Sequence, residues 1–370
     1  MNSFEAHLSE LADAGRLRRL PEDSSASALI DLSSNDYLGL AEDVELRRDF
    51  IGRLTPENFL PTSSASRLLS AHQDSYLKLE TRLAELYGWE TLLFNSGYHA
   101  NVGLVSALGG KDTLFVADRL VHASIIDGLK LSGSDFERFR HNDYGHLQRI
   151  IERRASSYRR LVIISESVFS MDGDSSDIAA LVAAKQLHPN AILYVDEAHA
   201  VGVCGPRGLG CVAASGLRDS VDILVGTFGK ALASSGAFAV LRPPLREFMV
   251  NHARSLIFST ALPPLCAEWT LYCLERSLTM DAERENLGRL ASALARVTGC
   301  GIESHIQPLI VGDARRAVEL SASLLSEGFK VLPIRTPTVP PGTERLRFSL
   351  SARLAVSEIE RLAGVMLKYS

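Results

Sequence analysis

The chain has 370 residues, of which 46% are hydrophobic and 22% are charged, and its formal net charge is -5. This balance is typical of a soluble globular protein with one large domain and a smaller one, and the acidic charge argues against a general nucleic-acid surface. No apolar run approaches the length of about 20 residues that crosses a membrane. The five cysteines form no Cys-x-x-Cys pair, which favours a reducing compartment and predicts no zinc site.

The first 20 residues are polar and amphipathic, without the apolar core of a signal peptide. Their spacing predicts a helix over residues 3–20, with a basic end at Arg16, Arg18 and Arg19. That cluster is either a solvated helix terminus or the rim of an anion site. A Ser-rich linker follows at 21–28. We therefore expect a cytoplasmic protein whose N-terminal segment is a helix and an arm.

Short apolar runs alternate with helical periods through the middle of the chain. Such near-continuous apolar runs are typical of strands buried on both faces of a mostly parallel sheet, which predicts an α/β fold of seven strands. Ligands of such sheets bind beyond the carboxyl ends of the strands. The predicted strands are 91–95, 113–117, 135–139, 161–165, 191–195, 222–226 and 237–241.

A second α/β unit closes the chain after helical residues 243–278, which Leu262-Pro263-Pro264 interrupts. Its strands are predicted near 305–311, 329–334 and 345–351, and its helices near 313–327 and 355–368. We therefore divide the chain into an N-terminal helix and arm (1–45), a large domain (46–278) and a small C-terminal α/β domain (279–370).

The sequence VGTFGK at 225–230 presents Lys230 after a predicted strand and a turn that two glycines permit. A lysine at a partly desolvated strand end can be neutral enough to act as a nucleophile, although a solvated loop lysine explains the pattern as well. The motif is not a phosphate-binding Walker A loop, because the first glycine position holds Leu224 and Ala231 follows the lysine. Thr227 offers a hydroxyl and an N–H to an anion beside the lysine.

The sequence DEAH at 196–199 ends another predicted strand. Asp196 is either a helix cap or a carboxylate that faces a cationic ring nitrogen. The same letters occur in DEAH helicases, but the Walker A loop and basic surfaces that those enzymes need are missing here.

Three further turns after strands carry polar side chains. Gly97 lets backbone N–H groups approach a phosphate at a helix N-terminus. His122 could lie over a flat ring, although a lone histidine at a strand end is also explained as a satisfied structural residue. Ser170 could donate to a phenolic oxygen, although an ordinary turn residue explains it as well. A lysine, an acid for a ring nitrogen, an anion cradle and polar ring neighbours together describe a pyridoxal 5'-phosphate (PLP) site.

The chain resembles the α-oxoamine synthases, PLP-dependent enzymes with the aspartate-aminotransferase fold (fold type I). The resemblance runs from about residue 30 to the end. It is carried by SSNDYLGL (33–40), VHAS (121–124), VFSMDGD (168–174), VDEAHAVGVCG (195–205), GTFGKA (226–231), SLIFSTALPP (255–264) and the segment 306–351.

The resemblance implies a role for each matching residue. Lys230, His122 and Asp196 would be catalytic. The cofactor would be bound by these three and by Gly97, Tyr98, Ser170, His199, Thr227 and, from the partner subunit of a homodimer, Ser259 and Thr260. The substrates would be bound by Arg18, Asn35, His122, Thr338 and Arg347.

Segments 255–264 and 306–351 point, within the family, to decarboxylative condensation of L-alanine with a pimeloyl thioester for biotin biosynthesis. The thioester would be carried on coenzyme A or on acyl-carrier protein. A sibling activity on glycine or serine, or a binding protein that kept the fold and lost the chemistry, are the alternatives. The sequence departs from the family at the loop 61–67, which has no glycine, and after the arginine motif, where Ala352-Arg353-Leu354 replaces the usual histidine.

Overall fold

The computed structural model describes residues 2–20 and 29–369, so the Ser-rich linker 21–28 lies outside the described residues. The chain forms two compact units. One comprises Leu38–Phe169 and Ser175–Arg284, and is here called the large unit. The other comprises Met1–Tyr37, Ser170–Asp174 and Glu285–Ser370, and is called the small unit. The three-part division at residues 45 and 278 stays a prediction about domains.

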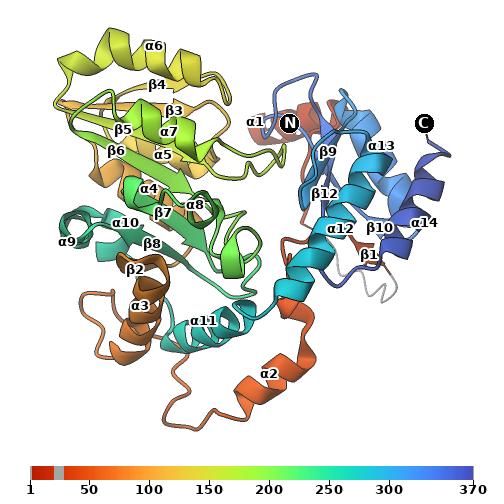
Figure 1. The fold of residues 1–370 in the computed structure, drawn as a ribbon. Helices are drawn as coiled ribbons and strands as arrows, with labels where there is room; N and C mark the ends of the chain where they lie inside the picture. The colour runs from red at the N-terminus through yellow and green to blue at the C-terminus, as the bar shows by residue number, and fades with distance from the viewer. Residues whose placement is uncertain (1, 21–28, 370) are drawn as a thin grey trace. The chain divides into compact units, whose positions relative to one another are not determined.

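A seven-stranded sheet forms the centre of the large unit (Figure 1). Its order is β2-β8-β7-β6-β5-β3-β4, and β8 alone runs antiparallel to its neighbours. The mostly parallel seven-stranded sheet predicted from the sequence is thereby confirmed. The strands are β2 (Glu90–Phe94), β3 (Thr113–Asp118), β4 (Asp135–Phe139), β5 (Arg160–Glu166), β6 (Ala191–Asp196), β7 (Ile223–Thr227) and β8 (Ala237–Leu241).

Alternate residues of the central strands enter two different hydrophobic cores, one on each face of the sheet. In β5, Leu161 and Ile163 belong to one core while Val162 and Ile164 belong to the other. Burial on both faces explains why these strands read as continuous apolar runs. Helices pack over the sheet, among them α3 (Asp74–Tyr87), α4 (Gly97–Ala107), α5 (Ala123–Leu131), α6 (Tyr144–Arg154), α7 (Ile178–Lys185), α9 (Pro243–His252), α10 (Arg254–Ile257) and α11 (Pro264–Ser277).

The small unit contains an antiparallel sheet of order β11-β12-β9 and a parallel pair of β1 with β10. Its strands are β1 (Ile30–Asp31), β9 (Ile306–Ile310), β10 (Phe329–Lys330), β11 (Leu332–Ile334) and β12 (Arg345–Ser349). Its helices are α1 (Ser3–Asp13), α13 (Ala314–Ser326), α14 (Val356–Met366) and most of α12 (Asp281–Thr298).

Three details of the sequence interpretation were wrong. The N-terminal helix ends at Asp13 instead of residue 20, because Gly15 adopts a left-handed φ of 65°. The predicted strand 329–334 is two short strands, since β10 pairs with β1 and β11 pairs with β12. The long helix α12 was not predicted at all.

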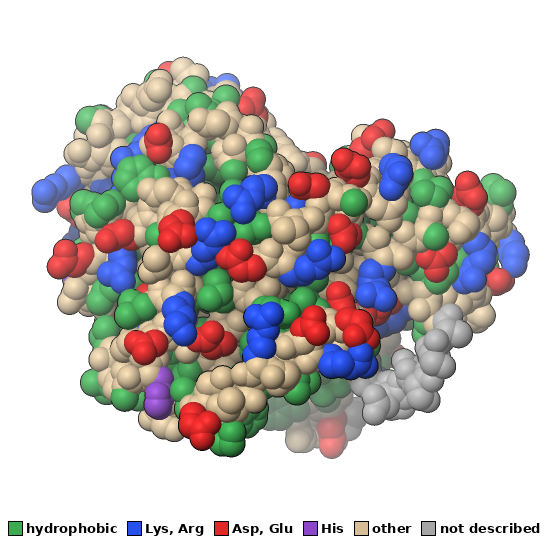
Figure 2. Space-filling view, turned by 60° about the horizontal axis from the view of Figure 1, so that its bottom comes forward, with side chains coloured by type: hydrophobic (Ala, Val, Ile, Leu, Met, Phe, Trp, Pro, Cys, Tyr) green, Lys and Arg blue, Asp and Glu red, His purple; other side chains and the backbone are tan. Residues whose placement is uncertain are grey.

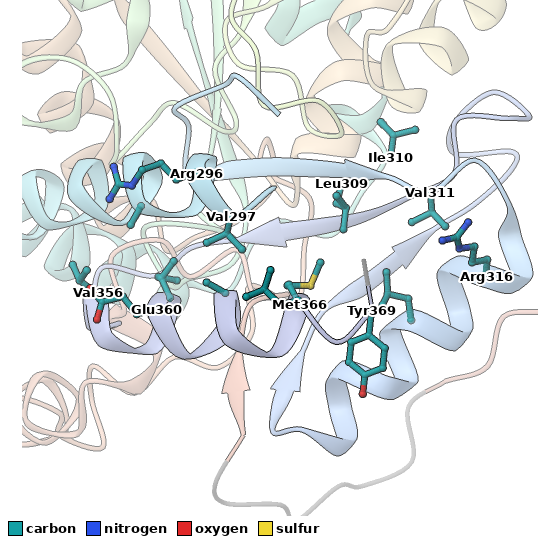
Figure 3. Close-up of a pocket in the computed structure, with 15 residues that line it drawn as sticks. Arg296, Val297, Leu309, Ile310, Val311, Arg316, Val356, Glu360, Met366 and Tyr369 are labelled. Carbon is teal, nitrogen blue, oxygen red and sulfur yellow. The ribbon is translucent and has the colours of Figure 1, made fainter. Parts of the chain in front are cut away.

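The small unit also holds a cavity of 620 Å³, lined mainly by apolar side chains of β9, α12, α13 and α14 (Figure 3). On the face shown in Figure 2, blue Lys and Arg side chains are interspersed with red Asp and Glu side chains. None of the helices in residues 2–20 and 29–369 has both the length and the apolar character that crossing a membrane requires.

Candidate active site

The chemically important residues of the large unit lie where parallel strands end. β5 and β6 are aligned so that Glu166 stands opposite Asp196, and Asp196 in turn stands opposite Val225 of β7. Lys230 follows β7 after a short turn. The carboxyl edge of the sheet therefore gathers residues from three strands, as the sequence pattern predicted.

The amine of Lys230 lies beside the imidazole of His199. Their Nζ and Nε2 atoms are 2.7 Å apart. His199 is buried, whereas Lys230 is half-buried. A lysine at a partly desolvated position is suited to give up its proton and to act on a substrate.

The buried carboxylate of Asp196 accepts two hydrogen bonds from groups in the large unit. The Asn101 side-chain amide donates to one carboxylate oxygen at 2.7 Å, and the Ala198 backbone N–H donates to the other at 2.9 Å. Asn101 is itself fixed, because its amide also reaches the Ser124 hydroxyl at 2.9 Å and its carbonyl accepts from the Tyr194 hydroxyl at 2.6 Å. The carboxylate is thus held in one orientation.

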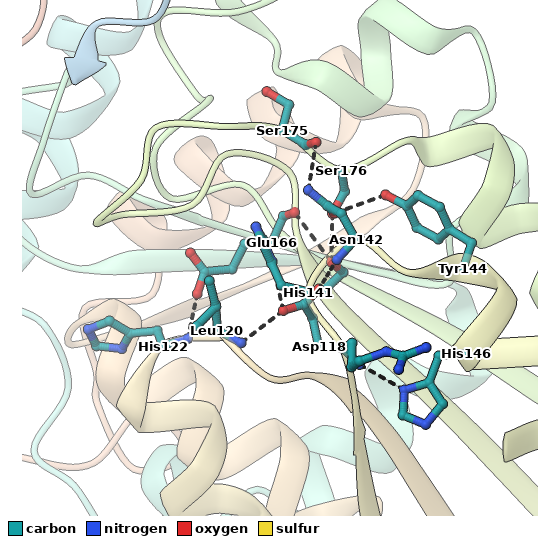
Figure 4. A network of polar contacts seen from close by, with 12 residues as sticks. Asp118, Leu120, His122, His141, Asn142, Tyr144, His146, Glu166, Ser175 and Ser176 are labelled. Carbon is teal, nitrogen blue, oxygen red and sulfur yellow. Dashed lines mark hydrogen bonds and ion pairs between the residues drawn. The ribbon is translucent and has the colours of Figure 1, made fainter. Parts of the chain in front are cut away.

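His122 forms the N-cap of α5 and is tied to the same cluster. Its Nδ1 lies 2.8 Å from the Ser124 hydroxyl, and its backbone N–H donates to the Glu166 carboxyl group (Figure 4). Desolvation by the surrounding protein and the positive charge of Lys230 lower the pKa of His122, against an opposing effect of Asp196. We therefore expect a neutral imidazole at pH 7, which can lie against a flat aromatic ring.

The N-terminus of α4 is where the sequence predicts an anion cradle, which stays a prediction. Ser96 caps this helix, and Gly97 begins it. A Cβ added at Gly97 would lie 3.8 Å from the Thr227 Cβ, so the start of α4 lies beside Thr227, whose hydroxyl donates to the Gly236 carbonyl at 3.1 Å. Tyr98 stands in the first turn, where its hydroxyl donates to Asp127 at 2.6 Å.

Ser259 and Thr260 lie in the segment between α10 and α11. The Asn95 side-chain amide donates to the Thr260 carbonyl at 2.6 Å, and Thr260 forms a bridge with Ser66. Ser259 is half-buried and Thr260 is exposed. The role of both residues at the site of a partner subunit stays a prediction.

The small unit holds a separate arginine site on β12. Arg347 is 3% exposed, and its Nε donates to the Ser170 carbonyl at 2.6 Å. Its two terminal nitrogens donate to the Asn35 side-chain oxygen at 3.2 and 3.1 Å. The guanidinium is thereby oriented, as an arginine that binds a carboxylate must be. The prediction that the Ser170 hydroxyl reaches the cofactor stays a prediction.

Arg18 and Thr338, which the resemblance assigns to the acyl substrate, also lie together in the small unit. The Arg18 guanidinium donates to the Thr338 hydroxyl at 3.0 Å. Arg335 donates to the Gly15 carbonyl at 2.9 Å, and it holds the N-terminal segment against this region. Burial and the positive charge of Arg18 lower the pKa of Arg335.

These residues fit PLP by their chemistry. The half-buried amine of Lys230, the oriented carboxylate of Asp196 and the glycine-lined cradle at Thr227 match the aldehyde, the ring nitrogen and the phosphate of this cofactor.

Comparison with known proteins decides the family. The family Aminotransferase class I and II matches residues 27–366. The 8-amino-7-oxononanoate synthase of Chlorobaculum parvum is 46% identical, with 95% of this chain and 94% of the relative covered. The 8-amino-7-oxononanoate synthase of Haemophilus ducreyi is 44% identical, with 99% of this chain and 100% of the relative covered.

The chain belongs to the class I and II aminotransferases and, within them, to the 8-amino-7-oxononanoate synthase family. The α-oxoamine synthase resemblance, PLP as cofactor, and a PLP-dependent acyltransferase as enzyme class are thereby confirmed.

Solved structures agree with this assignment. Serine palmitoyltransferase from S. paucimobilis with bound PLP-myriocin aldimine has a TM-score of 0.89 at 28% identity, covering 99% of this chain and 96% of that one. The 8-amino-7-oxononanoate synthase of Francisella tularensis has a TM-score of 0.78 at 26% identity, covering 92% of this chain and 98% of that one. The fold type I expectation is confirmed.

Sequence reasoning missed the residues that support the predicted ones. Asn101, Ser124 and Tyr194 hold Asp196 or His122 in place, and Glu166 binds the His122 backbone. A polar residue at a buried position of an apolar helix, such as Asn101 in α4, is the one signal that could have identified this support.

Proposed function

We propose that this chain catalyses the decarboxylative condensation of L-alanine with a pimeloyl thioester, giving 8-amino-7-oxononanoate, carbon dioxide and the free thiol, in biotin biosynthesis. The observation that carries the proposal is 44–46% identity to 8-amino-7-oxononanoate synthases over nearly the whole chain, together with the Lys230–His199–Asp196 arrangement. The protein would act as a homodimer in the cytoplasm.

When bound, PLP withdraws electrons from the α-carbon of an amino acid attached to it, so that this carbon can lose a proton and attack an acyl group. Lys230 takes the proton from the α-carbon and later returns one, since its amine is half-buried and next to His199. Asp196 keeps the ring nitrogen protonated by charge pairing, and His122 covers the ring with a neutral imidazole.

The remaining residues bind and orient the substrates. Arg347 binds the carboxylate of alanine, with Asn35 fixing the plane of the guanidinium. Arg18 and Thr338 contact the acyl substrate. Gly97 and Thr227 hold the cofactor phosphate at the N-terminus of α4, and Tyr98, Ser170, Ser259 and Thr260 complete the cofactor site.

A competition assay tests the choice of substrate. The purified protein receives equal concentrations of L-alanine, glycine and L-serine with pimeloyl-coenzyme A, and mass spectrometry identifies the amino ketones. We expect the alanine product to dominate, although one methyl group is worth only about 1–3 kcal/mol of discrimination. Dominance of the glycine or serine product would assign the chain to a sibling activity. The Lys230→Ala variant should have no measurable turnover, and a substantial residual rate would rule out the role of this lysine.

The acyl carrier is tested in parallel. Pimeloyl-coenzyme A and pimeloyl-acyl-carrier protein are compared by their kcat/KM values at saturating L-alanine. The thioester with the higher value is the donor that the enzyme prefers.

A further inference from the structure

One short segment belongs to the small unit although its neighbours along the chain on both sides belong to the large unit. The large unit runs to Phe169 and resumes at Ser175, so Ser170–Asp174, here called the connector, leaves it and returns to it. The connector carries the Ser170 carbonyl that accepts a hydrogen bond from the Arg347 Nε at 2.6 Å. The backbone of the connector therefore helps to orient the guanidinium of Arg347.

The small unit holds the middle of the connector. A Cβ added at Gly173, where φ is 73°, would lie 1.9 Å from the Ile306 carbonyl oxygen, so the two backbones pass in close contact. Asp172 pairs with Arg345 at 2.5 Å, a contact that needs only a positive charge at position 345.

The large unit holds both ends of the connector. At the first end, the buried ring of Phe169 meets the edge of the His141 ring, with centroids 4.4 Å apart and planes at 88°. At the second end, the Asn142 side-chain amide donates to the Ser175 carbonyl at 3.2 Å (Figure 4). Val168 and Ser175 also form a β-bridge. Two consecutive residues, His141 and Asn142, thus each hold one end.

A buried carboxylate fixes these two residues in turn. Asp118 is 0% exposed, and the Nδ1 atom of His141 lies 3.0 Å from one of its oxygens. The Asn142 backbone N–H donates to the other oxygen at 2.9 Å. The Asn142 side-chain oxygen accepts from the Tyr144 hydroxyl at 3.0 Å and from the Ser176 hydroxyl at 3.3 Å (Figure 4). Such a network of buried polar groups keeps each member in one orientation.

We propose that His141 and Asn142 are positioning residues for the amino-acid carboxylate, and that they act on Arg347 through the connector. The inference rests on the proposed function only in assigning this carboxylate to Arg347. Phe169 directly precedes Ser170 in the chain. Releasing the Phe169 ring therefore turns the Ser170 carbonyl away from the Arg347 Nε.

The bond to Ser170 fixes the plane of the Arg347 guanidinium. The two terminal nitrogens donate to the single side-chain oxygen of Asn35, and one acceptor atom defines a point and not a plane. A guanidinium makes two parallel hydrogen bonds to a carboxylate only when their planes agree. Loss of one orienting hydrogen bond corresponds to about threefold to tenfold weaker binding of the carboxylate.

The first experiment titrates the PLP-loaded enzyme with L-alanine, glycine, L-serine and ethylamine, and follows the cofactor absorbance. Ethylamine is alanine without its carboxylate, whereas the three amino acids share this group. His141→Ala should raise the Kd for each amino acid about threefold to tenfold and leave the Kd values for ethylamine and PLP unchanged. A role in general stability alone would not separate the amino acids from ethylamine.

A second variant and a control accompany His141→Ala. Asn142 has a φ of 50°, which glycine adopts without strain, so Asn142→Gly removes the side chain alone and should have the same effect as His141→Ala. Tyr144→Phe removes the hydroxyl that donates to Asn142 and leaves the Asn142 amide on Ser175. This control should lower stability without changing the Kd for the amino acids.

Hydrogen exchange of the PLP-loaded enzyme tests the hold on the connector directly. Backbone amides in peptides that cover residues 168–176 should exchange faster in His141→Ala and in Asn142→Gly than in the unchanged enzyme, because local opening becomes easier. Tyr144→Phe should exchange like the unchanged enzyme.

Three outcomes would overturn the proposal. One is an unchanged Kd for the amino acids in folded His141→Ala, or in Asn142→Gly if the first variant does not fold. The others are an equal rise for ethylamine and alanine, and a rise in Tyr144→Phe as large as in His141→Ala. Arg347→Lys, titrated in parallel, identifies which idea has failed. If it also leaves the Kd for alanine unchanged, the proposed carboxylate site is wrong, whereas a raised Kd in Arg347→Lys alone refutes only the positioning role.

Discussion

The Asn101→Ala substitution tests whether the fixed orientation of Asp196 matters for the cofactor. Asn101 is 2% exposed, and its amide donates to the carboxylate at 2.7 Å. Removing a hydrogen bond to a charged group costs about 1.5–3 kcal/mol, which corresponds to roughly 10–150-fold in affinity. We therefore expect the Kd for PLP to rise by about one to two orders of magnitude.

The matched control is Tyr194→Phe. It removes only the hydroxyl that donates to the Asn101 carbonyl at 2.6 Å, and it leaves the amide of Asn101 on Asp196. We expect a loss of about 0.5–1.5 kcal/mol in the free energy of unfolding and little change in the Kd for PLP. The Kd is measured by absorbance titration of the dialysed enzyme, and the stability by urea unfolding.

Comparing the two variants separates an effect of the Asn101 amide on PLP binding from a general loss of stability. If Asn101→Ala and Tyr194→Phe weaken PLP binding equally, or if Asn101→Ala leaves the Kd unchanged, then the amide is not what positions Asp196. A variant of Asn101 that unfolds would be replaced by Asn101→Ser, which is smaller and still polar.

Three further predictions concern the substrates and the pH dependence. Arg347→Lys should raise the KM for alanine about 10–100-fold, because lysine lacks the planar fork of a guanidinium. The control Arg345→Lys, on the same strand as Arg347, changes the 2.5 Å ion pair with Asp172 and should lower stability while leaving this KM unchanged. Equal effects on the KM would contradict the assignment. Arg18→Gln should raise the KM for the thioester about threefold to tenfold and leave the KM for alanine alone, and the opposite pattern would place the acyl site elsewhere. Burial raises the pKa of Glu197 from 4.5 to about 7, so the folded state binds more protons than the unfolded state between these two pH values. The free energy of unfolding should therefore fall by up to about 3 kcal/mol from pH 4.5 to 7. Urea unfolding of the Glu197→Gln variant should show no such fall.

The sequence was sufficient for features that are encoded locally. Each strand of the large sheet is a short apolar run buried on both faces, and β5 shows this alternation directly in its two cores. Lys230 and the DEAH segment stand next to such runs, so the position of the site at the strand ends followed from the strand assignments.

The sequence was insufficient where a contact joins distant residues. The hydrogen bond from Asn101 to Asp196 spans 95 positions, and that from Tyr194 to Asn101 spans 93. Nothing in the local pattern of α4 indicates which strand its buried amide will meet, because packing of the helix on the sheet decides this. The end of α1 at Asp13 was missed for another reason, since the apolar spacing continues to Leu17 while Gly15 ends the helix.

The buried acids of the large sheet show how packing selects among similar side chains. Asp118, Glu166 and Asp196 are each the last residue of a parallel strand, so the fold gathers three carboxyl groups at one edge. Glu166 receives the His122 N–H, and burial together with the nearby charge of Asp196 raises its pKa well above the usual value (Figure 4). Asp118 is occupied by the backbone N–H of Leu120, the N–H of Asn142 and the ring of His141.

Asp196 is the acid that lies within the predicted cofactor site, with the Asn101 amide and the Ala198 N–H as its donors. A second ionised carboxylate beside it would repel its charge, and the raised pKa of Glu166 favours the neutral form that lowers this repulsion. The site therefore presents one oriented charge to the ring nitrogen although the fold brings several acids to the same edge. It follows that Glu166→Gln, which keeps a neutral side chain of the same shape, should preserve PLP binding, whereas Asn101→Asp, which adds a carboxyl group beside Asp196, should weaken it. Equal Kd values for PLP in these two variants would contradict this account.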